Sequence, residues 1–101
     1  MEIKSIKVES NHFNDQKKTD DAVAFTKTAF QKYTHMKDIC NEVKKKMDDK
    51  YKGNYSVFVY KYGQGWYNIM FEEGNSVEIE VYAILKNWTE CYNVIVFLGC
   101  S

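Results

Sequence analysis

The side chains that most often do chemistry are few in this sequence and stand far apart. His12 and His35 are the two histidines, and neither has a cysteine or carboxylate at the spacing of a metal site. Each is more typical of a capping or surface residue. Cys40 falls on the apolar stripe of a predicted helix, which indicates a packed thiol rather than a nucleophile. Catalysis needs a nucleophile with its base, paired carboxylates in a cleft or a metal cage, so we expect no enzyme, no metal and no cofactor.

Glu78 and Glu80 are a pair of carboxylates with regular spacing. Glutamates alternate with aliphatic residues over 77–82, so Glu78, Glu80 and Tyr82 share one face of a predicted strand. Two carboxylates on one face can act as acid and base when further groups support them. The sequence offers no third group for such a role. We therefore favour a solvated or partner-facing acidic stripe.

Length and composition narrow the class of protein. The 101 residues, 45% of them hydrophobic, are enough for one domain over residues 1–101. All 14 basic residues are lysines, balanced by 14 acids, and arginine, the best donor to phosphates and guanine, is missing. Nucleic acid is therefore not an expected partner. No segment approaches the roughly 20 apolar residues that cross a membrane, so we expect a cytoplasmic chain without membrane insertion and with reduced cysteines.

The first half of the chain has the periodicity of two helices. Apolar residues recur at intervals of three and four over 22–33 and again over 36–47. Asn14 or Asp15 is the expected cap of the first helix. Only residues 34–35 separate the helices, which predicts a tight connection between neighbours. The two stripes are Ala22, Val23, Thr26, Ala29, Phe30 and Tyr33, followed by Met36, Ile39, Cys40, Val43 and Met47.

The second half of the chain is extended and rich in aromatic residues. A polar loop is predicted over residues 86–91. We expect an α+β fold in the order β-α-α-β-β-β-β, with two helices packed on one face of an antiparallel β-sheet. The other face must then meet water or another chain, and self-association is the economical answer. The predicted strands are a short one at residues 6–8 and four more at residues 55–62, 66–71, 77–82 and 94–98.

Two segments carry a resemblance to a known family. Residues 31–39, Gln-Lys-Tyr-Thr-His-Met-Lys-Asp-Ile, and residues 43–51, Val-Lys-Lys-Lys-Met-Asp-Asp-Lys-Tyr, closely resemble the second-helix signature of the small homodimeric dynein light chains. The order of elements is similar too. The resemblance runs from about residue 13 to the carboxyl end and leaves residues 1–12 as a poorly matched amino-terminal strand or extension. Divergent members of this kind also occur among flatworm tegument proteins.

The resemblance implies a homodimeric binding module. In this family a hairpin strand of each subunit crosses to the partner's sheet, and short extended segments of other proteins bind as an added strand in two grooves at the dimer interface. The exposed amides at the start of the second helix receive a polar side chain of the peptide. Carried over by position, the peptide-binding residues are Lys37, Asp38, Gly65, Trp66, Tyr67, Asn68, Ile69, Glu78, Glu80 and Tyr82.

The family also implies partners and a location. The expected partners are a second copy, the dynein intermediate chain or other proteins with short extended motifs, in the cytoplasm and on the cytoskeleton. Glu78 and Glu80 replace the aromatic residues usual in the family, which implies a preference for peptides bearing Lys or Arg. Ser56 stands where the family has a histidine at the dimer seam. The alternative is a structural protein of a cell cortex or tegument, with the same fold but no functional peptide groove.

Overall fold

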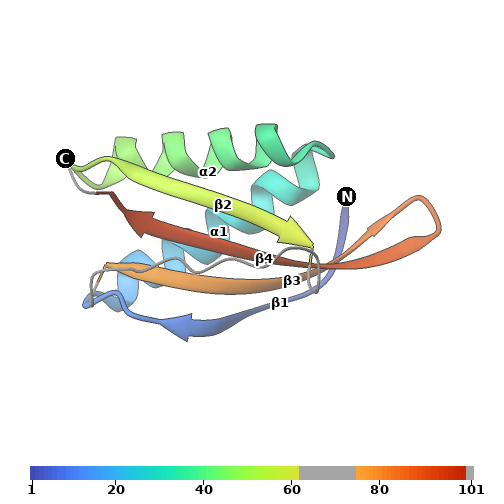
Figure 1. Ribbon diagram of the computed structural model, residues 1–101, viewed down its shortest axis with the longest axis horizontal. Coiled ribbons are helices and arrows are strands. Elements are labelled where there is room, and N and C mark those ends of the chain that lie inside the picture. The colour runs from blue at the N-terminus through green and yellow to red at the C-terminus, as the bar shows by residue number, and fades with distance from the viewer. Residues whose placement is uncertain (62–74, 100–101) are drawn as a thin grey trace.

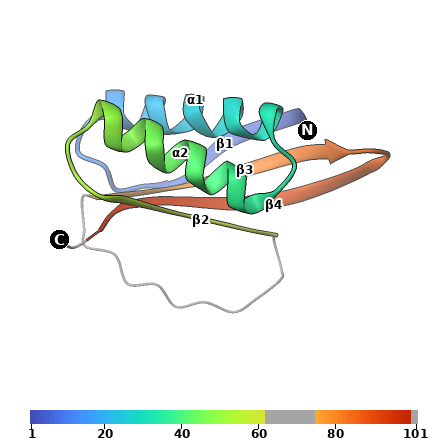
Figure 2. The same cartoon turned by 90° about the horizontal axis from the view of Figure 1, so that it is seen from above.

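A computed structural model describes residues 1–61 and 75–99 of the chain (Figure 1). The strands form one antiparallel sheet in the spatial order β1-β3-β4-β2. Both helices lie on the same face of this sheet (Figure 2), so the predicted α+β class is confirmed. The predicted strand at 66–71 lies outside the described residues. The elements are β1 (Glu2–Asn11), α1 (Gln16–Lys32), α2 (Met36–Lys50), β2 (Tyr55–Lys61), β3 (Ser76–Leu85) and β4 (Trp88–Leu98).

Both helices form where the periodicity predicts them. Asp15 takes the N-cap position of α1, and its side chain accepts a hydrogen bond from the Lys17 N–H at 3.0 Å. His35 precedes α2 and makes no side-chain capping bond. In the described part of the chain, neither helix is long and apolar enough to cross a membrane. The buried helix residues are Thr19, Ala22, Thr26, Ala29 and Phe30 in α1 and Ile39, Val43 and Met47 in α2.

One face of β3 forms the aliphatic floor of the core. Its side chains are at most 1% exposed and belong to the same buried cluster as the helix stripes. Phe30 of α1 meets Tyr92 of β4 there, with ring centroids 5.3 Å apart. Burial of one valine or isoleucine side chain contributes about 1.5–3 kcal/mol. The floor residues of β3 are Val77, Ile79, Val81 and Ala83.

A polar cluster ties the end of α2 to α1. The Asp21 carboxylate of α1 accepts hydrogen bonds from Lys50 Nζ at 2.7 Å and from the Tyr51 hydroxyl. The hydrogen bond from Lys50 is the main cause that holds the pKa of Asp21 below its ordinary 3.8, and the bond from Tyr51 acts in the same direction. Because the pairing favours the ionised carboxylate, it contributes most when Asp21 is charged.

β1 is longer than the sequence predicts. The alternation of Ile6 and Val8 predicts a short strand at 6–8, whereas β1 has 10 residues. The additional residues are mostly polar, and they are held because β1 pairs with β3 along nearly its whole length, with two register shifts. Pairing with a neighbouring strand therefore outweighs weak local preference.

The predicted polar loop over residues 86–91 is wrong. β3 runs to Leu85 and β4 begins at Trp88, so only Lys86 and Asn87 turn the chain. Leu85 and Trp88 face each other across the two strands. The contact between these two side chains stabilises the hairpin here. Residues 88–91 are therefore strand, although their polar composition alone indicates a loop. The tip of the hairpin projects beyond both helices (Figures 1 and 2).

Truncation of a core valine tests the packing. Val81 is fully buried in β3, so Val81→Ala is expected to lower the free energy of unfolding by about 2 kcal/mol. Urea denaturation followed by circular dichroism measures this loss. Val8→Ala is the matched control, because Val8 is 41% exposed, and it should cost under about 1 kcal/mol. Equal losses would contradict the assignment of this face as the core.

Acid unfolding tests the Asp21 cluster. The pKa of Asp21 is lowered by folding, so its contribution to stability is complete above the unfolded value of 3.8 and is lost as pH falls toward the folded value. Asp21→Asn is expected to lower the free energy of unfolding at pH 7 by about 1 kcal/mol. It should also flatten the loss of stability below pH 4. Asp20→Asn, an exposed neighbour on α1, is the control and should keep the wild-type profile.

Candidate functional site

β2 is an edge strand of the described sheet and pairs only with β4. In an antiparallel pair, alternate residues direct their main-chain N–H and C=O toward the partner strand and away from it. Tyr55 points away, because its N–H donates to Asp48 Oδ1 at 2.8 Å and its C=O accepts from Lys44 Nζ at 2.8 Å. The main chain of Val57 and Val59 therefore points to the same outer edge. No strand in residues 1–61 or 75–99 pairs with this edge.

Charged side chains of α2 bind only the beginning of the outer edge. Lys44 Nζ also contacts Asp48 Oδ2 at 2.8 Å and Asn54 Oδ1 at 2.7 Å. Burial acts to raise the pKa of Asp48, but the hydrogen bonds from Lys44 and from the Tyr55 N–H outweigh it and leave the pKa below its ordinary 3.8. The start of β2 is thus fixed to α2 by a charged cluster, whereas the rest of the strand is not.

Cys40 stands on α2 beside the outer edge of β2. The sequence places it on the core stripe, but the thiol is only half-buried and lies next to the main chain of Val59. The reason is angular, because Ile39 and Val43 fill the core and position 40 is turned about 100° from position 39. Burial raises the pKa of the Cys40 thiol, so the thiol is protonated at neutral pH. The Cys40 side chain is therefore a small, uncharged group beside β2.

The second face of the sheet, turned away from α1 and α2, is called the helix-free face below (Figure 2). Phe58 is 46% exposed on this face and stacks on Phe97, with ring centroids 5.6 Å apart. An exposed phenylalanine stacked on a half-buried one is a surface on which another chain can pack. By strand alternation the face comprises Ser56, Phe58 and Tyr60 of β2, Ser76, Glu78, Glu80 and Tyr82 of β3, and Cys91, Asn93, Ile95 and Phe97 of β4.

Polar contacts hold both glutamates of the helix-free face. Glu78 Oε1 accepts hydrogen bonds from Asn93 Nδ2 at 2.9 Å and from the Tyr60 hydroxyl at 3.2 Å. Glu80 is 8% exposed and forms an ion pair with Lys7 at 3.3 Å. Asn93 is also buried, and its Oδ1 has no hydrogen-bond partner in the described part of the chain. One buried acceptor on this face therefore lacks a donor, which is unfavourable unless another group supplies one.

The structure places the predicted site residues in two layers. Lys37 and Asp38 are exposed in the first turn of α2, within the helix layer. Glu78, Glu80 and Tyr82 lie together on the helix-free face, so the sheet separates the two groups. The predicted groove strand falls outside the described residues, and its members are Gly65, Trp66, Tyr67, Asn68 and Ile69.

Sequence reasoning missed the residues that shape the edge. Lys44 and Asp48 are four apart on one helix, a spacing that indicates an ion pair, but nothing local shows that both reach the main chain of Tyr55. Asn93 interrupts an apolar strand, and a polar residue in such a position is a signal of a buried contact. Among the described residues, no three histidine, cysteine or acidic side chains come together as a metal site.

Comparison with known proteins identifies the family. A family model described as dynein light chain type 1 matches residues 5–85. Comparison with curated proteins finds no match. The matched range runs from within β1 to the end of β3 and includes both helices, the outer edge of β2 and the two glutamates of β3. The chain therefore belongs to the dynein light chain family, a family of binding modules rather than enzymes.

Proposed function

We propose that two copies of this chain associate and clamp short, extended segments of partner proteins by strand addition. The outer edge of β2 carries the proposal, because its main chain points away from the sheet and, within the described residues, has no strand partner. An unpaired edge of this kind is a template for an added strand. Membership of the dynein light chain family supports the same role.

In this proposal the chain is a subunit of the dynein motor or an assembly hub for several proteins. Its partners are the dynein intermediate chain or other proteins with short extended motifs, in the cytoplasm and on the microtubule cytoskeleton. Main-chain hydrogen bonds supply affinity that depends little on sequence, and side-chain contacts supply selectivity. One module can then bind partners that are unrelated apart from a short motif.

The first strand on the outer edge of β2 would come from the second copy. Residues 66–71 are predicted to be extended, and they would cross to β2 of the partner subunit. Their own outer edge, over Gly65 to Ile69, would then receive the peptide. The main chain of Tyr55 is already satisfied by α2, so the crossing strand would begin to pair at Val57.

One feature of the helix-free face supports association of two copies. Phe58 is 46% exposed beside Phe97, and its transfer from water to a second chain would be favourable.

The proposed peptide site combines the crossing strand with residues of both layers. Lys37 and Asp38 would receive a polar side chain of the peptide at the start of α2, where helix amides are exposed. Glu78, Glu80 and Tyr82 would form the floor and favour basic peptides. Lys7 already pairs with Glu80, so a basic peptide would compete with this lysine.

The contacts of the two glutamates also favour a second candidate function. Glu78 is engaged by Asn93 and Tyr60, and Glu80 by Lys7. A face whose carboxylates are satisfied internally needs no charged ligand. This observation supports a structural protein of the cell cortex or tegument that keeps the fold and lacks peptide binding.

Sedimentation equilibrium tests the association of two copies. The wild-type chain is expected at twice its monomer mass of 11.9 kDa. Phe58→Lys places a charge in the exposed aromatic pair and should shift the mass to that of one chain, with an unchanged circular dichroism spectrum. Val8→Lys is the matched control, because Val8 is 41% exposed on β1 and pairs with Ile79 of the other face. A wild-type monomer at all accessible concentrations would contradict the proposal.

A double substitution tests the acidic floor. Changing Glu78 and Glu80 together to glutamine is expected to weaken a Lys-bearing extended peptide about tenfold at low salt, or ~1.4 kcal/mol. The salt dependence of affinity should fall with it, because exposed charge pairs are screened over about 10 Å at 0.1 M. Isothermal titration calorimetry measures both, with Asp20→Asn as the control for loss of an exposed carboxylate elsewhere. Unchanged affinity and salt dependence would favour the structural alternative.

A further inference from the structure

The tip of the β3–β4 hairpin is a surface that the proposed function does not use. In the described part of the chain β2 reaches Lys61, opposite Tyr92, and residues 88–91 of β4 lie beyond this pair. The tip also projects beyond both helices (Figures 1 and 2). The family match ends at residue 85 and leaves the turn and β4 outside it. The turn and Trp88 therefore lie outside the match, whereas Lys61 and Leu85 lie within it.

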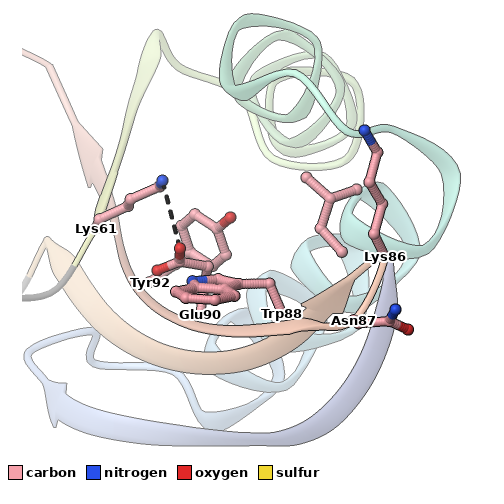
Figure 3. Close-up of a pocket in the computed structure, with 7 residues that line it drawn as sticks. Lys61, Lys86, Asn87, Trp88, Glu90 and Tyr92 are labelled. Carbon is pink, nitrogen blue, oxygen red and sulfur yellow. Dashed lines mark ion pairs between the residues drawn. The ribbon is translucent and has the colours of Figure 1, made fainter.

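A pocket of about 410 Å³ opens on the helix side of the tip. Leu85 and Trp88 face each other across the strands and form its apolar wall with Tyr92 (Figure 3). Trp88 is 68% exposed and Leu85 is 36% exposed. A tryptophan held this far into water, beside a hollow with an apolar wall, is typical of an anchor for a partner protein.

The rim of the pocket is positively charged. Lys61 pairs with Glu90 at 3.5 Å, and both side chains point across the pocket (Figure 3). Lys86 rims the opposite side, and it has no ion pair with any described residue. Two lysines against one glutamate leave a net positive charge, so charge complementarity favours an acidic partner.

The backbone of Lys86 is strained. Its φ of 60° lies in the left-handed region, and within residues 1–61 and 75–99 it is the one non-glycine residue with a positive φ. Glycine adopts this conformation without the clash that a Cβ introduces, and it is the usual residue in such two-residue turns. A lysine kept at a position that favours glycine indicates that its ammonium group has a use there.

We propose that the tip binds an acidic segment of a partner protein through an apolar anchor. The segment places an apolar side chain against Trp88 and brings carboxylates to Lys86 and Lys61. The matching motif is therefore an apolar residue with an acidic residue on either side of it. The site is separate from the outer edge of β2, and it prefers the opposite charge to the acidic floor.

An NMR titration of the full chain tests this site. The probe is the blocked peptide Ser-Glu-Thr-Phe-Thr-Glu-Ser, which places a phenylalanine between two glutamates. We expect saturable shifts of the amides of residues 85–91 and of the Trp88 indole N–H, with Kd below about 1 mM at low salt. The same peptide with lysines for glutamates, and one with serine for phenylalanine, should leave these signals unchanged.

Lys86→Gly separates binding from folding. Glycine relieves the strained φ, so the melting temperature should stay equal or rise, while affinity for the acidic peptide should fall at least about fivefold. Lys45→Gly on α2 is the control for loss of a lysine elsewhere and should bind normally. The proposal is overturned if Lys86→Gly binds as wild type, if the lysine peptide binds equally well, or if no tip signal moves at about 2 mM peptide. Tip shifts on dilution of the chain alone would instead show a second copy in the pocket.

Discussion

Every main-chain N–H and C=O of an edge strand needs a partner, and charged side chains of α2 supply partners only for the first residue of β2. Lys44 and Asp48 take both groups of Tyr55. Further along β2, the neutral thiol of Cys40 on α2 contacts the main chain of Val59. The sheet is thus fixed by charged groups at one end of β2, and within the described residues the rest of its outer edge has no strand partner.

Packing of the two helices on one face imposes a second constraint on the sheet. They cover one face of the sheet, and the aliphatic floor of β3 is buried beneath them. The helix-free face has an exposed phenylalanine, Phe58, beside Phe97. An open edge and a partly apolar face on the same sheet are the two surfaces that a crossing strand and a second sheet would cover together.

Charge is distributed unevenly over a chain whose formal net charge is +0. The carboxylates of the helix-free face are held by contacts within the chain, including the ion pair of Glu80 with Lys7. At the hairpin tip the balance is reversed, because Lys86 adds to the Lys61–Glu90 pair. The two proposed binding surfaces would therefore prefer opposite charges and would not compete for one segment.

Local sequence was sufficient to predict the parts of the fold in which local preference and long-range packing agree. The stripes of α1 and α2 and the alternation of β3 are of this kind, because one residue pattern both forms the element and builds its buried face. β1 and the tip around Trp88 were not predicted, since pairing with β3 holds polar segments extended. The ties from Lys44 to Tyr55 and from Asn93 to Glu78 join residues of different elements, so periodicity carries no signal for them.

Amide hydrogen exchange at Val57 tests the central claim most directly. If the outer edge of β2 is open in one chain and covered in the pair, the Val57 amide should be protected in the wild-type protein. It should exchange at least about 100-fold faster in the monomeric Phe58→Lys variant at equal global stability. Rapid exchange of this amide in wild-type protein that sediments as a dimer would contradict the account, and so would equal protection in the monomer.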